Sequence, residues 1–208
     1  MSVYSYVVDR DYGFAPNPFY GICTLATCKP DIRRKASIGD WVIGTGGARR
    51  RMSGRLIYAM KISEALSFDE YFNDHRFQFK KPNLSGSLKQ CFGDNIYSQD
   101  VDGDWQQLDS HHSLRDGSPN PENVIRDTGT NRLLLASEFT YFGADAPLLP
   151  EPIRSRGPDG ICCGRYHRVT FEQDSLDLFF DWYSGFGPAG RRGKPLEWLK
   201  NGGMVRGS

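Results

Sequence analysis

The chain has 208 residues and a formal net charge of +1, and 38% of its residues are hydrophobic and 25% charged. This composition is typical of one soluble globular domain and excludes a disordered chain. No apolar stretch approaches the ~18 residues of a membrane span, and the first residues lack the pattern of a signal peptide. We therefore expect a cytoplasmic protein.

Charge and cysteine patterns narrow the possible partners. Basic residues cluster at residues 33–35, 49–51 and 191–194. Solvated loop charge is the simpler interpretation of each cluster, and contact with phosphates is the alternative. The five cysteines, an odd number, indicate reduced thiols. Their spacings do not form the paired motif of a zinc site, so a structural zinc is not favoured.

The amino-terminal part predicts a short strand followed by a long loop. Residues 3–9 alternate in the manner of a strand. Residues 10–30 are rich in glycine, proline and aromatic side chains but carry few charges, whereas ordinary surface connections are shorter and more polar. A long loop with apolar side chains folds on itself or lines a pocket, so these residues indicate a site near the amino terminus.

A hairpin and a short helix are expected next. Residues 40–47 and 55–63 predict two strands joined by a short basic loop. Ser67, with Glu70 three residues later, forms a capping-box pattern that opens a short helix. Residues 44–47 lack the helix start and the Lys-Ser/Thr pair of a P-loop, so a glycine-rich hairpin end is favoured. The alternative is that the basic hairpin tip contacts a nucleic-acid backbone.

Residues 78–131 show little periodicity and contain many prolines and glycines, with one short strand expected at residues 95–98. Such a long irregular stretch is either disordered or wraps the core and contributes to a site. Its aromatic residues favour the ordered alternative, because disordered segments contain few of them.

The remaining chain completes an α+β domain. Residues 132–137 and 166–171 predict strands, residues 172–183 an amphipathic helix, and residues 195–200 a last helical turn. About five to seven short strands without βαβ alternation favour a curved or barrel-like mixed sheet with long loops and peripheral helices. We expect residues 1–145 to form the core, and residues 146–208 to form an extension packed on the same domain.

Three polar side chains gather at residues 93–97. If Asn95 begins a strand, Asn95 and Tyr97 share one face. The asparagine could then bond an adenine-type edge, and the tyrosine could stack on a base. The alternative is an Asx-turn capped by Asp94, with Tyr97 packed in the core. Both interpretations remain open.

Residues 109–113 contain the adjacent histidines His111 and His112. A neutral histidine can relay a proton or bind a metal, and a nearby aspartate can orient it. Adjacent side chains of an extended chain point apart, so only one of the two is expected to serve a given site. An exposed polar loop is the alternative.

Cys28 lies beside Lys29 in the opening loop, and a thiol next to a cation can act as a nucleophile. No histidine is adjacent to it in the sequence, and small buried cysteines are common. A structural cysteine is therefore the favoured interpretation.

Four motifs resemble those of a bacterial and phage family, the second of the nucleotide modification associated domains. They are residues 12–30 (YGFAPNPFYGICTLATCKP), 38–46 (IGDWVIGTG), 93–97 (GDNIY) and 110–113 (SHHS). The likeness extends from residue 3 to residue 145. The family is proposed to act in hypermodification of nucleic-acid bases. The resemblance therefore implies a nucleotide or DNA partner, and partner proteins from modification operons.

The polar residues of these motifs are those that the resemblance carries over as a nucleotide site: Asn17, Thr24, Lys29, Asp40, Asp94, Asn95, His111 and His112. Tyr97 and Arg51 join them as a stacking contact and a backbone contact. The acid/base group would be Asp94, His111 or His112. The cofactor stays unknown, because the sequence contains no P-loop, methyl-donor glycine motif or convincing metal set.

Residues 38–63 resemble, more loosely, the core hairpin of PUA and EVE barrels, which read RNA or modified bases. Two functions therefore remain open. One is an enzyme that helps to modify a base taken out of a duplex or a free nucleotide. The other is a non-catalytic reader of a modified base, in which residues 49–51 hold the backbone.

Overall fold

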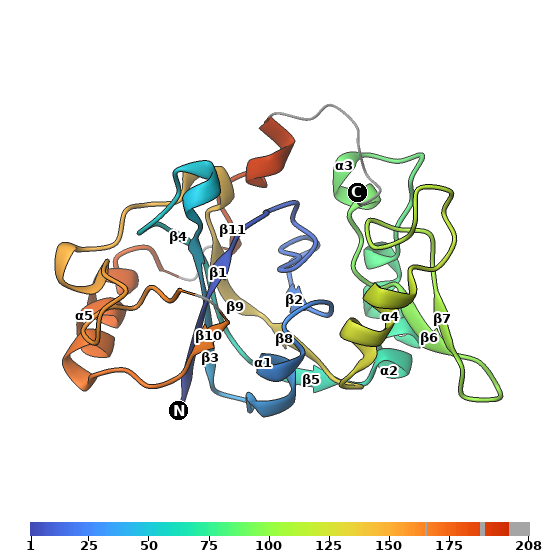
Figure 1. The fold of residues 1–208 in the computed structure, drawn as a ribbon, viewed down its shortest axis with the longest axis horizontal. Helices are drawn as coiled ribbons and strands as arrows, with labels where there is room; N and C mark the ends of the chain where they lie inside the picture. Colours follow the sequence, from blue (N-terminus) through green and yellow to red (C-terminus); the bar gives the residue numbers. More distant parts are fainter. Residues whose placement is uncertain (165, 188–189, 200–208) are drawn as a thin grey trace.

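A six-stranded mixed sheet forms the main layer of the protein (Figure 1). The computed structural model describes residues 1–164, 166–187 and 190–199. The sheet order is β10-β1-β3-β4-β9-β11. Its strands are β1 (Val3–Val8), β3 (Trp41–Gly46), β4 (Leu56–Lys61), β9 (Glu138–Tyr141), β10 (His167–Arg168) and β11 (Gly190–Arg191). β1 is parallel to β3 and β11 is parallel to β9, whereas the other neighbours are antiparallel.

The hairpin of β3 and β4 forms as predicted. Its register places Trp41 opposite Lys61 and Gly44 opposite Tyr58. Both strands are almost entirely buried, because both faces of the sheet are covered. Gly44 is required by packing, since a Cβ at this position would lie 2.3 Å from the Tyr58 ring. Gly44 thus makes room for the Tyr58 ring within the sheet.

Helix α5 (Gln173–Ser184) packs against the main sheet through one apolar face (Figure 1). Phe179 and Tyr183 are buried four positions apart, which is the spacing of one helix face. The Trp41 ring of β3 contacts the Tyr183 ring edge-on at 5.5 Å. The connection before α5 contains the 3₁₀ helices η3 (Gly143–Asp145) and η4 (Glu151–Ile153).

A second sheet of order β2-β8-β5 separates two hydrophobic cores. Its strands are β2 (Cys23–Leu25), β8 (Leu133–Ala136) and β5 (Glu64–Leu66). Along β8, Leu134 and Ala136 belong to the core of the main sheet, whereas Leu133 and Leu135 belong to the second core. This alternation follows from the two-residue period of a strand. The second sheet is therefore a wall with a core on either side.

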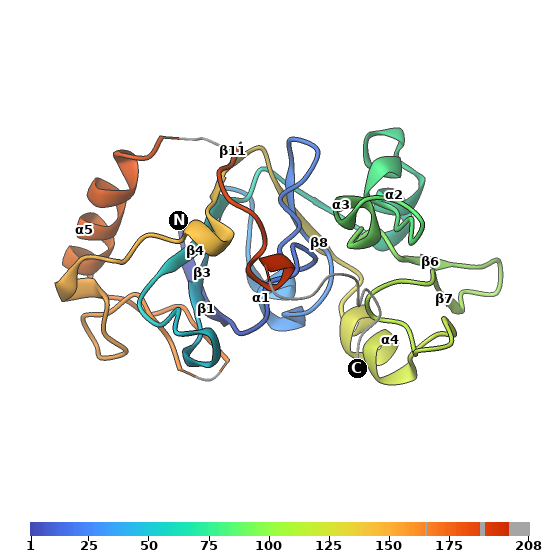
Figure 2. The same cartoon turned by 90° about the horizontal axis from the view of Figure 1, so that it is seen from above.

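Short helices and a small hairpin enclose the second core, on the side of the molecule away from α5 (Figures 1 and 2). These elements are α2 (Phe68–Asn73), η2 (His75–Lys80), α3 (Leu88–Cys91), α4 (Pro121–Thr128), β6 (Tyr97–Gln99) and β7 (Trp105–Gln107). Helix α1 (Pro30–Lys35) lies between the two parts. The 3₁₀ helix η1 (Ala48–Arg50) forms the tip of the main hairpin, and η5 (Leu196–Leu199) follows β11.

The α+β class with a mixed sheet and few helices is confirmed, whereas the barrel-like alternative for the sheet is not. The described residues form three separate sheets, none of which closes, and the likeness to PUA and EVE barrels is not confirmed. The expected number of strands is too low, because eleven are present in the described part of the chain. Several have only two or three residues, too few to show a periodic pattern. The strand expected at residues 166–171 is one of these, reduced to His167–Arg168.

Of two local predictions, that of the capping box is confirmed and that of a mostly irregular segment is not. The capping box of Ser67 and Glu70 is present as predicted. Residues 78–131, in contrast, are more regular than expected, because they contain α3, β7 and α4. The last residue of the helical turn expected at residues 195–200 lies outside the described residues. Within the described ranges, no helix is long and apolar enough to cross a membrane.

Candidate functional site

The loop of residues 9–22, between β1 and β2, lines a pocket. The pocket has a volume of about 280 Å³ and is lined by Pro18, Phe19, Tyr20, Gly21, Lys89, Ser137, Phe139, Gly190 and Arg191. These lining residues include two cations and no carboxylate. The Lys89 ammonium lies 4.4 Å from the centre of the Tyr20 ring, and the Arg191 guanidinium lies 5.9 Å from that of Phe19. Aromatic rings beside cations suit an anionic or flat ligand.

A network of polar side chains is buried beside this loop. The Lys80 ammonium donates to Asn17 Oδ1 at 2.7 Å and to Thr24 Oγ1 at 3.1 Å. The Thr24 hydroxyl donates to Asp94 Oδ2 at 2.5 Å, and the Tyr71 hydroxyl donates to Asp94 Oδ1 at 2.8 Å. All five side chains are at most 1% exposed. We call these residues the Lys80–Asp94 network.

Burial controls the charges of this network. Desolvation raises the pKa of Asp94 and lowers the pKa of Lys80, while the charge of each opposes the shift of the other. Asn95 extends the network, because its amide donates to the carbonyls of Tyr71 and Phe77. These bonds join α2, η2 and β2 in the second core. The network therefore ties these elements together through buried polar contacts.

A second polar cluster lies just beyond the carboxyl end of β2 and is partly exposed. The Cys28 Sγ atom lies 3.9 Å from Nε2 of His112, and Nδ1 of His112 lies 2.6 Å from Oδ2 of Asp127. Because a carboxylate only accepts, Nδ1 carries a proton and Nε2 faces the thiol. The His112 side chain is 12% exposed and the Asp127 side chain 0%. A thiol, an imidazole and a carboxylate in this order can act as nucleophile, base and orienting group.

Asp127 is the centre of this Cys28–His112–Asp127 cluster. Its Oδ1 accepts from the backbone N–H of Cys28 at 2.9 Å and from Nε of Arg126 at 3.0 Å. Its Oδ2 also accepts from the Tyr97 hydroxyl at 3.0 Å. One buried carboxylate therefore fixes the backbone of Cys28 and the ring of His112 at the same time.

Arg33 fastens the Cys28 loop to the end of α4. Its side chain is buried, and Nε donates to the Cys28 carbonyl at 2.8 Å. The terminal nitrogens donate to the carbonyls of Asp127, Thr130 and Arg132. Desolvation lowers the pKa of Arg33 to about 10, against the opposing charge of Asp127. A guanidinium bonded to four carbonyls holds these two segments in a fixed geometry.

The segment that carries His112 is held by a tight turn. The Ser110 N–H donates to Ser113 Oγ at 3.0 Å, and the His112 N–H donates to Ser110 Oγ at 3.3 Å. The side-chain amide of Asn123, on α4, donates to the His112 carbonyl at 2.8 Å. Helix α4 thus supplies Asp127 and also positions the backbone of His112.

The cluster shifts the pKa of both His112 and Asp127. Burial by itself would lower the pKa of His112, but the hydrogen bond to Asp127 and the contact with Cys28 raise it to about 9. Burial would likewise raise the pKa of Asp127, but His112 and Arg126 lower it to about 2. At neutral pH the pair is therefore an imidazolium with a carboxylate, and Nε2 can give a proton to a neighbouring group.

Aromatic side chains surround the two histidines. The Phe14 ring lies 4.5 Å from His112, and the Tyr12 ring lies 4.4 Å from His111. Phe92 lies 5.2 Å from His111 and stacks on Tyr12 at 5.3 Å. Phe14 and Phe92 are buried, whereas Tyr12 and His111 are partly exposed. This aromatic cluster offers a surface on which a flat ring can stack next to His112.

Comparison with known proteins identifies the family. The model of nucleotide modification associated domain 2 matches residues 1–202. The chain belongs to this family. The resemblance based on four motifs is thereby confirmed, and the match continues well beyond the last of these motifs. No curated protein and no solved structure matches the chain.

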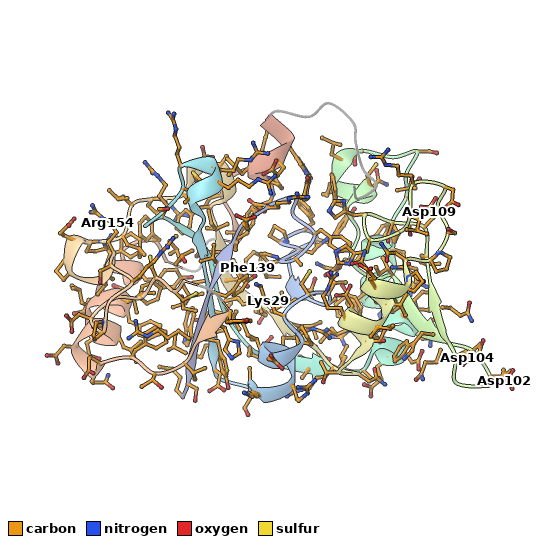
Figure 3. The ribbon with its side chains drawn as sticks, in the orientation of Figure 1. Lys29, Asp102, Asp104, Asp109, Phe139 and Arg154 are labelled. Carbon is orange, nitrogen blue, oxygen red and sulfur yellow. The ribbon has the colours of Figure 1, made fainter. Side chains whose placement is uncertain are left out.

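In this nucleotide modification associated domain, Lys29 lies beside Cys28, between the main sheet and the second core (Figure 3). Its ammonium lies 4.6 Å from the centre of the Tyr6 ring, and burial lowers the pKa of Lys29. Cys28 and Lys29 have φ values of 57° and 41°, a left-handed conformation that is uncommon outside glycine. Such conformations gather at functional sites, where the surrounding structure maintains them.

The predicted site residues lie in several different parts of the structure. Asn17, Thr24, Asp94 and Asn95 belong to the buried network, while Lys29, Tyr97, His111 and His112 lie at the Cys28–His112–Asp127 cluster or its aromatic neighbours. Asp40 and Arg51 lie beyond opposite ends of β3. The Asp40 carboxylate accepts from the N–H groups of Ser2 and Ser37, whereas Arg51 is exposed.

Sequence reasoning missed Lys80, Arg33, Arg126 and Asp127 in this family member. The pair Asn120-Pro121 signals the start of α4, because asparagine caps a helix and proline suits its first turn. Recognising that signal would have placed Asp127 on a helix close to the two histidines. No local pattern shows that Lys80 is buried. Among the described residues, no group of three or more His, Cys, Asp or Glu side chains is arranged to hold a metal ion.

Proposed function

We propose that this protein binds a nucleobase or nucleotide beside His112 and takes part in its modification. The observation that carries the proposal is the contact between the aromatic cluster and the His112–Asp127 pair. The Phe14 ring touches His112, and His112 bonds to Asp127 at 2.6 Å. A stacking surface is thus continuous with an acid/base group, as chemistry on a flat ring requires.

The roles follow from exposure and charge. Tyr12 and His111 are partly exposed, and a base would stack on their rings. His112 would move a proton, because its ring is partly exposed while its carboxylate partner is buried. Arg126, with 45% of its side chain exposed, would attract the phosphate of a nucleotide. Asp94 has no such role here, because its carboxylate is enclosed in the core.

The pocket beneath the opening loop would hold a further part of the ligand. Its two cations, Lys89 and Arg191, suit a phosphate group, and its aromatic walls suit a sugar or base. Phe19 of the pocket stacks on Trp198 at 5.4 Å, and Trp198 stacks on Phe92 at 6.1 Å. The pocket and the aromatic cluster are therefore joined by packed rings, which suits a ligand longer than one nucleotide.

Calorimetric titration with the four deoxynucleoside monophosphates and with a single-stranded oligonucleotide tests the binding. We expect saturable binding by the wild type. Tyr12→Ala should weaken it at least about fivefold, because stacking on an aromatic side chain contributes about 1–3 kcal/mol. Tyr166→Ala is the matched control, since Tyr166 is 82% exposed. Absence of binding by the wild type would overturn the proposal.

Mass spectrometry of nucleosides tests the modification. DNA from cells that express the protein with its genomic neighbours should contain a new base, and His112→Asn should abolish it. Binding without any new base would instead favour the non-catalytic reader, which uses the same stacking surface and forms no product.

A further inference from the structure

We infer that Cys28 is a nucleophile that adds to C6 of a pyrimidine ring, while His112 moves the proton and Asp127 orients the imidazole. The inference rests on the proposed binding of a nucleobase beside His112. It goes further by naming a covalent step, the atom that attacks and the class of base attacked.

Exposure separates Cys28 from the other cysteines. All five are free thiols, and Cys23, Cys91, Cys162 and Cys163 are buried, whereas Cys28 is partly exposed. Desolvation raises the pKa of each of the four buried thiols, that of Cys23 to about 12. A buried thiol that holds its proton is a poor nucleophile. Cys28 is therefore the one thiol of the chain placed to react.

The imidazolium lies beside this thiol, where Nε2 can give a proton to a base that the sulfur attacks. Nε2 of His112 is 3.9 Å from Sγ, a distance that a small movement on substrate binding would shorten. Asp127 holds Nδ1 at 2.6 Å and so directs Nε2 towards the sulfur. Arg33 fixes the Cys28 carbonyl at 2.8 Å, which keeps the thiol at this position.

The charges that act on Cys28 are mostly positive. They belong to Lys29, Arg33, Arg126 and His112, and the buried carboxylate of Asp127 is the anion among them. A positive surrounding stabilises a substrate ring that accumulates negative charge during the addition.

The chemistry of the bases selects the substrate class. A thiolate is a soft nucleophile and adds readily to a carbon–carbon double bond conjugated to a carbonyl or imine. The C5=C6 bond of uracil and cytosine rings is such a bond. The aromatic cluster would hold the flat ring, with the Phe14 ring 4.5 Å from that of His112. We therefore assign the site to a pyrimidine.

The step balances with solvent water as the only further reactant. The Cys28 thiol gives its proton to solvent water, and the Sγ–C6 bond forms as the C5=C6 π bond breaks. The electron pair moves to C5 and its conjugated oxygen or nitrogen, and C5 then receives the proton from Nε2. The product is a 5,6-dihydropyrimidine bound through sulfur. In the adduct, C5 carries its original hydrogen and the one received from Nε2. When the addition reverses, either of the two can leave, so the C5 hydrogen exchanges with solvent.

Exchange at C5 is the test. The full chain is incubated in deuterium oxide with deoxyuridine monophosphate, with deoxycytidine monophosphate and with a single-stranded oligonucleotide that contains both bases. Loss of the C5 proton signal is followed by nuclear magnetic resonance. We expect exchange by the wild type, a loss of at least about 100-fold in Cys28→Ser, and a loss of about 100-fold in His112→Asn.

Controls separate this inference from the proposed function. Cys91→Ala removes a buried thiol of α3 and should leave the exchange rate unchanged. Circular dichroism checks that each variant is folded, and calorimetry with the same nucleotides measures binding. Binding without exchange by the wild type, or exchange that survives in Cys28→Ser, overturns the covalent step and leaves the proposed function intact. Absence of both binding and exchange overturns the two together.

Discussion

The Lys80–Asp94 network and the Cys28–His112–Asp127 cluster contain similar chemical groups in different surroundings. In each, a tyrosine hydroxyl donates to the central carboxylate, Tyr71 to Asp94 at 2.8 Å and Tyr97 to Asp127 at 3.0 Å. In the network, however, no side chain is more than 1% exposed. In the cluster, the thiol and the imidazole are partly exposed while the carboxylate is buried.

The two carboxylates show what this difference does to charge. Desolvation is the main influence on Asp94 and raises its pKa. Asp127 is also buried, but its direct contacts with His112 and Arg126 lower its pKa to about 2. A cationic partner in direct contact thus keeps a buried carboxylate charged. The first arrangement encloses its carboxylate in the second core, and the second arrangement holds an imidazolium beside a thiol.

The largest expected effect is on the free energy of unfolding of the protein, when the Lys80–Asp94 network loses its carboxylate. Asp94→Ala leaves Thr24 and Tyr71 without their shared acceptor and the buried Lys80 ammonium without its counter-charge, so the free energy of unfolding should fall by about 3–5 kcal/mol. Urea denaturation followed by circular dichroism measures it. Asp102→Ala, at an exposed turn, should change it by less than about 0.5 kcal/mol. Similar small losses in both variants would mean that the network is not structural.

The free energy of unfolding should depend on pH, because His112 of the cluster binds a proton more tightly in the folded state. The groups that face His112 are Cys28, Arg126 and Asp127. The pKa of His112 is raised from 6.5 to about 9 in the folded state. Its contribution to stability, about 3 kcal/mol, is therefore fully present below pH ~6.5 and is lost as the pH rises through ~9.

His112→Asn isolates this contribution. The difference in unfolding free energy between wild type and variant should shrink as the pH rises from about 6 to about 10. The imidazole proton resonances of the wild type should titrate near pH ~9. Titration near pH ~6.5 instead would show that the contact with Asp127 does not hold the proton. On the acid side, the contribution of Asp127 should be lost as the pH falls from about 4 towards about 2.

A smaller effect is expected when Asp127 loses one of its donors. Tyr97→Phe removes the hydroxyl that donates at 3.0 Å and should lower the free energy of unfolding by about 1.5 kcal/mol. Nucleotide binding should persist if Tyr97 positions Asp127 and does not itself stack on a base. Tyr12→Phe is the control, since a phenyl ring keeps the stacking surface. A large loss of binding in Tyr97→Phe would place this hydroxyl in contact with the ligand.

The smallest effect on stability is expected outside both clusters. Arg51→Ala removes an exposed guanidinium beyond the end of β3 and should change the unfolding free energy by less than about 0.5 kcal/mol. If Arg51 contacts a nucleic-acid backbone, the salt dependence of oligonucleotide binding should become weaker by about one unit of slope. Arg34→Ala, whose charge is paired with Asp31, should leave that slope unchanged. Equal slopes in all three proteins would exclude Arg51 from the interface.

Local patterns in the sequence predicted several elements correctly. The hairpin of β3 and β4 follows from two apolar runs around a basic turn, and α2 begins at the capping box of Ser67. Helix α5 follows from the spacing of Phe179 and Tyr183. The short strands β2, β5, β7 and β11 escaped prediction, because such elements are fixed by their neighbours more than by their own periodicity. Helix α4 escaped it although Asn120-Pro121 gives a local signal for its start.

The sequence by itself determined the family, the central hairpin and the set of polar residues from which a site could be built. Only the tertiary structure decided which of them meet and which reach the surface. It enclosed Asp94 with Lys80, and it brought Cys28 to a histidine 84 positions away and to an aspartate 99 positions away. Exposure and long-range contact depend on the packing of whole elements, and no local pattern of residues encodes them.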